Sequence, residues 1–459
     1  MLVHILNRFR WVFCQLEVLR DCLPPSVRST LDELPESLDE TYERVLKEIK
    51  KPNRGHARRL LSCLVAAVRP LRVEELAEVL AVDYEDEEGI PRLNPNWRWE
   101  DQEQAILTSC SSLIAIIESD ESRVVQFSHF SVKEYLTSTR LSTSSGDVLR
   151  YHIALEPAHT ILAQACMSAL LRSDDHVERN GIENTSQLAP YAAEHWVIHA
   201  KYENVSSCLR KAMEYLFDLD KPYFAAWQEL CNIDTDAPTG STFYFFTLYS
   251  SFILRPLPLY YAALCGFQDL VEHLIRKYPQ HVNSRGGWYV TPLVAALAGE
   301  HFQTAKILRD NGADPNIRGY NDGTPLHSAA YYGDFQMVQV LLEHKADVNA
   351  RRDNGETPLH LWPNDVFTTS RHTPSQISQL HNVSRLLLEH GADVNARSDD
   401  KLTPLHIAAR EGRVEVVRVL LEHGASVGAE DEEGRTPFQL ASSEGHSDII
   451  NLLSEHGAK

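Results

Sequence analysis

Thr403-Pro404-Leu405-His406-Ile407-Ala408-Ala409-Arg410-Glu411-Gly412 is the stretch that decides the fold of the C-terminal half, because it recurs along the chain. Copies of its Thr-Pro opening start at 291, 324, 357, 403 and 436, with spacings of 33, 33, 46 and 33 residues. A degenerate copy, Leu257-Pro258-Leu259-Tyr260, lies 34 residues before the first of these. A fixed period of this length is typical of stacked repeat architectures.

One copy shows what each repeat is expected to form. Thr403 opens a first helix, Pro404 stands where a helix tolerates proline, and Gly412 ends it. Gly424 follows the second helix as a left-handed cap. The apolar stripe of that second helix consists of Val414, Val417, Leu420 and Leu421. One such pair cannot bury its own apolar face, whereas six stacked pairs can.

These copies resemble the ankyrin repeat family, which has the same 33-residue period and a Thr-Pro-Leu-His-x-Ala signature. The resemblance covers about 255–459 and implies a curved solenoid of six repeats over 256–459. It also implies protein binding on the concave helix face and the hairpin tips. Three copies end in Ala-Asp-x-Asn, at 313–316, 346–349 and 392–395. For His327, His360 and His406 the resemblance implies structural hydrogen bonding rather than metal binding or catalysis.

Two features depart from the simple repeat. In the fourth copy, Pro363 is predicted to stop the first helix, and 13 extra residues precede the second helix near Val383. This segment is either a tolerated surface insertion or a partner-contacting loop. The run Gly424–Gly428 matches the G-x-S-x-G nucleophile elbow, but it follows a helix and Ser426 occupies the repeat's Asp position. A hydrolase is therefore disfavoured, because the elbow must follow a strand.

The first half has the outline of a winged helix. Ser37-Leu38-Asp39-Glu40 is a capping box that predicts a helix to about Ile49. Further helices are expected at about 57–68, 73–82, 103–110 and from Ser131 onward, with a strand hairpin at 113–117 and 124–127. DNA binding needs a basic recognition helix, and neither 73–82 nor 103–110 contains Lys or Arg.

This half resembles the corresponding part of fungal NACHT–ankyrin proteins, which are NLR-like signal-transducing ATPases. The motifs that carry the resemblance are Phe9-Arg10-Trp11, Cys14-Gln15-Leu16, Leu34–Tyr42 (LPESLDETY), Arg69-Pro70-Leu71, Glu74–Glu78 (EELAE) and Phe127–Leu136 (FSHFSVKEYL). In that family an NTPase core, a winged helix, a helical region and ankyrin repeats follow one another. The resemblance implies that His129 matches a histidine that contacts the phosphate of a bound nucleotide. The alternative is a helix-start histidine with a structural role.

The NTPase core itself is missing from this sequence. The phosphate-cradling G-x-x-x-x-G-K-[ST] loop has no counterpart, since the first glycine is Gly55 and no Gly-Lys pair occurs. We therefore expect no ATP or GTP hydrolysis through that chemistry, and a vestigial role for His129. The expected domains are a helical remnant of the post-NTPase region over 1–51, a winged-helix-like domain over 52–146 and a helical linker domain over 147–255.

The helical linker domain contains two prominent amphipathic segments, at 151–171 and 188–202. His195 and His199 share one helix face, as zinc ligands do, but a third ligand and the His-Glu-x-x-His order are missing. We interpret them as core or interface histidines. The aromatic segment 223–261 is expected to pack this region onto the first repeat.

Composition narrows the class of function. The formal charge is −20, and both halves of the chain, divided at Leu254, are acidic, which disfavours nucleic-acid binding. Eight scattered cysteines without a Cys-x-x-Cys pair argue against a disulfide framework or a cysteine-rich zinc site. The acidic stretch 83–88 lacks the spacing of a calcium loop. No apolar run is long enough to cross a membrane, and residues 1–16 do not form a convincing signal peptide.

The sequence thus predicts a mainly α-helical cytoplasmic protein, a helical and winged-helix region followed by an ankyrin solenoid. Its predicted function is protein–protein recognition, as a scaffold or sensor without catalytic activity, cofactor or metal. The alternative is the C-terminal part of a nucleotide-regulated switch whose NTPase lies upstream or in another chain. The candidate partner-binding residues are Tyr320, Tyr331, Tyr332, Arg351, Arg352, Arg410 and Glu411, at hairpin tips or first-helix ends.

Overall fold

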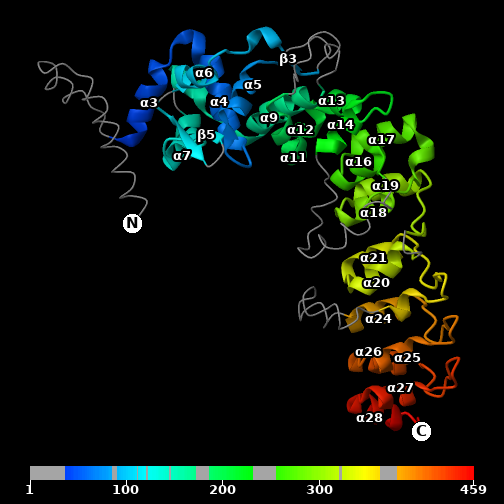
Figure 1. The fold of residues 1–459 in the computed structure, drawn as a ribbon. Coiled ribbons are helices and arrows are strands. Elements are labelled where there is room, and N and C mark those ends of the chain that lie inside the picture. The colour runs from blue at the N-terminus through cyan, green and yellow to red at the C-terminus, as the bar shows by residue number, and fades with distance from the viewer. Residues whose placement is uncertain are drawn as a thin grey trace, which may run out of the picture. The chain divides into compact units, whose positions relative to one another are not determined.

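The computed structural model describes residues 37–84, 90–110, 112–119, 122–143, 146–171, 186–230, 255–319, 323–361 and 380–458. The chain divides into two compact units, 1–232 and 233–459, and each is described by itself. The first unit holds the winged helix and the helical region, and the second holds the repeats (Figure 1).

The winged-helix domain of the first unit is built from short helices, a three-stranded sheet and a separate two-stranded sheet that the sequence analysis did not anticipate. Its first half contains α3 (Leu38–Glu48), η2 (Lys51–Asn53), α4 (Arg54–Ala66), β1 (Leu71–Arg72) and α5 (Val73–Leu80). Its second half contains β2 (Val82–Asp83), β3 (Arg92–Leu93), η3 (Pro95–Trp97), α6 (Gln102–Cys110), β4 (Ile114–Ser119), β5 (Ser122–Phe127) and α7 (Phe130–Leu136). The predicted helices from Ser37 onward and the predicted hairpin are present. Helix α3 was expected within the helical remnant over 1–51, of which residues 1–36 lie outside the described residues.

The sheet contains one strand that the sequence analysis did not anticipate. The hairpin of β4 and β5 is joined by β1, in the order β1-β5-β4. Leu71 of β1 pairs with Val125 of the central strand, and both side chains are fully buried. A strand of two residues is too short to show an alternating pattern, so only its pairing with β5 defines it.

Helix α3 is capped at its start and packs on α7, so the motif that contains Tyr42 and the motif that contains Ser131 contact each other in the fold. The Ser37 side chain accepts a hydrogen bond from the Glu40 backbone N–H at 3.2 Å, as the capping box predicts. One turn later, the Tyr42 hydroxyl bonds the Ser131 Oγ of α7 at 2.8 Å. The rings of Tyr42 and Tyr135 lie 5.4 Å apart. These contacts tie the first helix to the helix after the wing.

Two buried glutamates of α5 are held by arginines outside the helix. Glu75 is 1% exposed and accepts two bonds from the Arg69 guanidinium, at 2.7 and 2.9 Å. Glu78 is 3% exposed and accepts bonds from Arg98, from the Ser186 hydroxyl and from a backbone N–H at 188. A buried carboxylate is costly unless it is fully paired. These contacts therefore hold the segments that contain Arg69, Arg98 and Ser186 against α5.

The rest of the first unit is an aromatic-rich helical region. Its elements are α8 (Thr139–Ser142), η4 (Gly146–Tyr151), α9 (Leu155–Leu170), α11 (Ala189–Ala200), α12 (Val205–Cys208), α13 (Arg210–Leu216) and α14 (Tyr223–Leu230). Trp196, Phe217 and Trp227 are fully buried and contact one another. The predicted packing of segment 223–261 on the first repeat depends on residues 231–254, which lie outside the described residues.

The second unit is a stack of helix pairs that runs from green to red in Figure 1. The first two pairs are α16 (Pro258–Cys265) with α17 (Gln268–Lys277) and α18 (Pro292–Ala298) with α19 (Phe302–Asp310); the short η6 (Pro279–His281) lies between them. The next two are α20 (Pro325–Tyr332) with α21 (Phe335–Glu343) and η7 (Pro358–His360) with α24 (Leu380–Glu389). The last two are α25 (Pro404–Arg410) with α26 (Val414–Glu422) and α27 (Pro437–Glu444) with α28 (Ser447–Glu455).

The fifth pair shows the local signals that the sequence predicts. In α25, Thr403 caps the helix in extended conformation, with Pro404 in its first turn. Ala408 and Ala409 are fully buried, so neighbouring helices approach closely. Gly412 has a φ of +74°, and a Cβ there would lie 2.8 Å from the His446 ring of the next repeat. Glycine is therefore required both by the backbone and by the neighbouring side chain.

The fourth repeat departs from the others at the predicted place. Its first helix is only the 3₁₀ turn Pro358–His360, after which Leu361 is extended. Its second helix begins at Leu380, near the predicted position. The insertion lies within residues 362–379, which, with Pro363, are outside the described residues, so the choice between a surface insertion and a partner-contacting loop stays open.

No helix within the described ranges is long and apolar enough to cross a membrane. Five cysteines in these ranges are free thiols, four of them buried.

Candidate interaction surface of the solenoid

The histidines of the repeat signature bridge successive repeats. The Nδ1 of His406 accepts the Thr403 backbone N–H at 3.1 Å and lies 2.8 Å from the Thr403 hydroxyl. Its Nε2 donates to the Arg435 carbonyl of the next repeat at 3.1 Å. His327 and His360 make the same contacts, to the carbonyls of Glu356 and Leu402.

This hydrogen-bonding pattern requires neutral histidine. A backbone N–H can only donate and a carbonyl can only accept, so Nδ1 is unprotonated and Nε2 carries the hydrogen. Burial lowers the pKa of His327 to about 4, and burial likewise lowers the pKa of His360 and of His406. A neutral, fully engaged imidazole in the core is a structural group, in agreement with the role that the ankyrin resemblance implies.

The Ala-Asp-x-Asn motifs form a second ladder between repeats. The Asn349 backbone N–H donates to Asp347 Oδ1 at 3.0 Å, and the Asn349 side-chain Oδ1 accepts the Asp393 N–H of the next repeat at 2.8 Å. Its amide group donates to the Gly391 carbonyl at 3.0 Å. In the following repeat, the Ser426 N–H bonds Asn395 Oδ1, as an Asp at this position does elsewhere. Ser426 thus occupies the repeat's Asp position, as predicted.

Arginines form a third ladder along the hairpin tips. Arg318 donates to the Arg351 carbonyl at 2.7 Å, Arg351 donates to the Arg397 carbonyl at 2.9 Å, and Arg397 donates to the Glu430 carbonyl. Carboxylates add ion pairs, Arg318 with Asp353 at 2.7 Å and Arg351 with Asp399 at 3.7 Å. The tips are therefore linked to one another before any partner binds.

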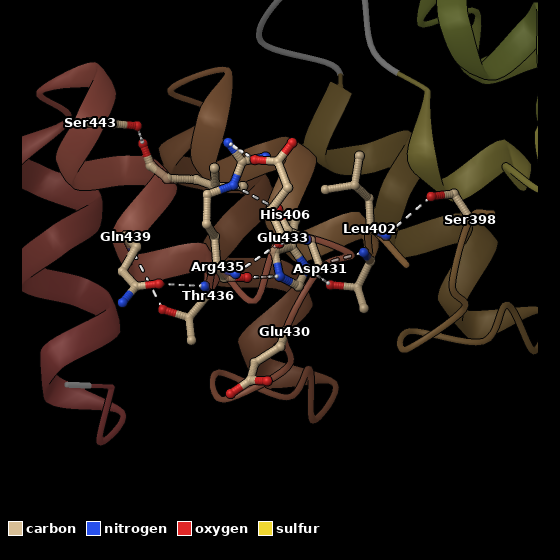
Figure 2. Close-up of polar contacts among 12 residues, drawn as sticks. Ser398, Leu402, His406, Glu430, Asp431, Glu433, Arg435, Thr436, Gln439 and Ser443 are labelled. Atoms are coloured by element: carbon tan, nitrogen blue, oxygen red, sulfur yellow. Dashed lines mark hydrogen bonds and ion pairs between the residues drawn. The ribbon is translucent and has the colours of Figure 1, made fainter. Parts of the chain in front are cut away.

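The last described tip is organised around one buried carboxylate, that of Asp431 (Figure 2). It accepts the backbone N–H groups of Glu433 and Arg435 at 3.0 and 2.8 Å, and it pairs with the Arg435 guanidinium at 2.9 Å. These bonds to the charged form lower the pKa of Asp431 against the opposing effect of its burial. The loop that supplies the carbonyl partner of His406 is thereby held in place.

Among the predicted partner-binding residues, the two tyrosines form an aromatic pair with one exposed ring. Tyr332 is 50% exposed at the end of α20, and Tyr331 beside it is half-buried. Their rings meet edge to face, with centroids 5.3 Å apart. Exposed aromatic groups of low conformational freedom are the typical anchors of protein interfaces.

The charged residues among the predicted partner-binding residues differ in the ion pairs and hydrogen bonds that they already make within the chain. Arg410 and Glu411 occupy the positions of these tyrosines in the fifth repeat and pair with each other at 3.4 Å. Arg352 pairs with Glu356 at 3.4 Å, while Arg351 belongs to the tip ladder described above. Tyr320 lies outside the described residues.

His129 lies in the first unit, far in sequence from these residues, at the N-terminus of α7. Its Nδ1 accepts the Ser131 N–H at 3.3 Å and lies 2.6 Å from Ser131 Oγ, and its ring packs at a tilt against the Phe130 ring, with centroids 4.2 Å apart. Through Ser131 this cap connects to Tyr42 of α3. The geometry is that of a helix-start histidine. Its relation to a nucleotide stays a prediction.

The second histidine group lies in the helical region. His199 is fully buried, with Nδ1 2.9 Å from His159 Nδ1 and Nε2 2.9 Å from the Tyr191 hydroxyl. Burial lowers the pKa of His199 to about 3. His195 contacts the Tyr191 ring edge to face. No group of three His, Cys, Asp or Glu side chains in the described part of the chain could hold a metal ion.

Comparison with known proteins places two domain types on this chain. Ankyrin repeat models match residues 308–361 and 375–459, and the model described as "GPI inositol-deacylase, winged helix domain" matches residues 42–146. These matches confirm the predicted ankyrin repeats and winged helix. They do not reveal an NTPase of the NACHT type.

A curated relative is the "Azaphilone pigments biosynthesis cluster protein L" of Monascus ruber. It is 30% identical over 307 residues, which cover 62% of this chain and 61% of the relative. The chain thus spans about three fifths of the length of this relative.

Proposed function

We propose that this protein is a protein-interaction scaffold or sensor that recognises a protein partner through the solenoid and has no catalytic activity of its own. The observation that carries the proposal is the exposure of Tyr332 and Arg410 at the ends of first helices whose buried faces are held by the histidine bridges. Ankyrin repeats support a role in protein interaction.

The ladders support the proposal by making the surface rigid. Histidine bonds connect the third to the sixth repeat, and asparagine and arginine bonds add further links between neighbouring repeats. A preorganised surface loses little conformational entropy on binding, so exposed anchors contribute most of their contact energy to affinity. We also propose a cytoplasmic protein, because the four buried cysteines are free thiols, as a reducing compartment favours.

The test is affinity capture with a matched control. The binding variant changes Tyr331, Tyr332 and Arg410 to Ala, and the control changes Gln336, Gln339 and Arg418, three exposed outer-helix side chains, to Ala. Proteins captured by the wild type from its native host are quantified by mass spectrometry. We expect a partner that the binding variant loses at least tenfold and the control retains, with melting temperatures unchanged within about 2 °C. Equal capture by both variants would contradict the proposal.

A second candidate function rests on the winged-helix match at 42–146. In this proposal the chain is the C-terminal part of a nucleotide-regulated switch, and the NTPase lies upstream or in a separate chain. The mass of the endogenous protein, measured with an antibody to the repeats, distinguishes the two. A species much heavier than 52.0 kDa that contains a Gly-Lys phosphate loop would favour the switch. A single species near 52.0 kDa would favour the scaffold.

A further inference from the structure

The first unit contains an open groove of about 870 Å³ that none of the features above uses. It lies between α4, the end of α5, β2, η3 and the start of α6. Its lining includes three aromatic side chains, Tyr84, Trp97 and Trp99, and two exposed carboxylates, Glu100 and Asp101. A connecting segment that only faces solvent has no need of exposed aromatic rings, so the rings beside these carboxylates indicate a binding surface.

The two tryptophans are exposed on a segment whose position is fixed. Trp97 is 47% exposed and Trp99 is 51% exposed, although tryptophan is among the side chains that lose most by contact with water. Arg98 between them is held by the buried carboxylate of Glu78. Because this arginine is anchored, the flanking tryptophans are presented to the groove by an ordered backbone rather than by a loose loop.

The groove already holds one cation on an aromatic face. The guanidinium carbon of Arg59 lies 4.7 Å from the centroid of the Tyr84 ring. The positive charge of Arg98 is balanced by Glu78. Glu100 and Asp101 therefore leave the exposed part of the groove acidic, next to two tryptophan rings.

We propose that this groove binds a basic peptide segment, with an arginine or lysine side chain against Trp97 or Trp99 and its charge near Glu100 and Asp101. A tryptophan face attracts a cation more strongly than other rings do, and the attraction grows as the pair is desolvated. The acidic rim repels phosphate-bearing ligands, which disfavours nucleotides and nucleic acids as occupants of this groove. An open groove accommodates an extended chain that passes through it.

The test uses the full-length protein and a fluorescein-labelled peptide of alternating Gly and Arg. Trp97→Ala/Trp99→Ala removes the rings, and Glu100→Gln/Asp101→Asn removes the charges. The control, Glu444→Gln/Glu455→Gln, removes two exposed charges in the last repeat. We expect affinity to fall about tenfold for each groove variant and less than twofold for the control. A peptide with citrulline in place of arginine should bind about tenfold more weakly.

Three results would overturn the proposal. An equal loss in the control variant would mean general attraction to an acidic protein. Equal binding of the citrulline peptide would mean an apolar docking site, and full binding by the tryptophan variant would exclude the groove. If Trp97→Ala/Trp99→Ala does not fold, acrylamide quenching of the wild type replaces it. The peptide should then protect tryptophan fluorescence in the wild type more than in Trp97→Phe/Trp99→Phe, and equal protection would also overturn the proposal.

Discussion

His406 offers the sharpest test of how the solenoid is held together. The side chain is fully buried, and its two nitrogens connect the start of its own repeat to the Arg435 carbonyl of the next. His406→Ala removes both bonds, leaves the Thr403 N–H and the Arg435 carbonyl unpaired, and opens a cavity. At 1–3 kcal/mol for each unsatisfied buried group, the cost is about 4 kcal/mol with the cavity included.

The chain contains a natural comparison for this change. In the last repeat Gln439 occupies the histidine position, and its Oε1 accepts the Thr436 N–H at 3.0 Å. His406→Gln should therefore keep the bond within the repeat and lose the bond between repeats. We expect a cost of about 1–2 kcal/mol for this variant, at most half of that for alanine.

Hydrogen exchange of the last repeat is the suitable assay, because repeat proteins open locally. Amides of α27 and α28 should exchange roughly 10³-fold faster in His406→Ala and about tenfold faster in His406→Gln, since 1.4 kcal/mol is a factor of ten. Unchanged exchange in the alanine variant, or equal damage by both substitutions, would refute the bridging role.

Three further predictions follow from buried groups and one backbone position. Glu75→Ala should lower the free energy of unfolding of the first unit by about 3 kcal/mol, because its arginine partner keeps an unpaired charge; a loss below about 1 kcal/mol in urea titration would show that the pair is dispensable. Gly412→Ala should cost about 2–3 kcal/mol, from a left-handed backbone and a collision with His446; Gly445→Ala, whose added Cβ meets nothing within 4 Å, should cost about 1 kcal/mol, and equal costs would contradict the collision. Acid should weaken the repeats: the native pKa of His327 is about 4 and the unfolded value about 6.5, so the contribution of this histidine is complete only well above pH 6.5 and falls by about 1.6 kcal/mol from pH 6.5 to pH 5. Urea midpoints at these two pH values should differ more for the wild type than for His327→Gln, and an identical difference would contradict this sign.

The sequence predicted most of the solenoid because each repeat repeats its own local signals. The Thr-Pro start, the small residues of the first helix and the terminal glycine recur with one period, so a single copy such as 403–424 explains the others. The wing hairpin was predicted from its strand pattern for the same local reason. The third strand was missed because Leu71 and Arg72 acquire strand geometry only by pairing with Val124 and Val125.

The candidate surface was less predictable because its bonds join residues far apart in sequence. Arg351 was predicted as a partner-binding residue, but its tip contacts, Arg397 and Asp399, lie beyond the insertion of the fourth repeat. Charged residues of an amphipathic helix are normally assigned to the solvent, so the burial of Glu75 and Glu78 could not be inferred from their spacing. Only the folded chain shows the arginines that neutralise them.

The central claim is that a protein partner contacts the first-helix ends of the solenoid. Hydrogen exchange of the full-length protein with and without the captured partner tests this claim most directly. The account predicts that peptides covering 324–333 and 403–412 become protected, while those of the outer helices α21 and α26 change little. Protection confined to the outer helices, or to the first unit alone, would contradict the claim.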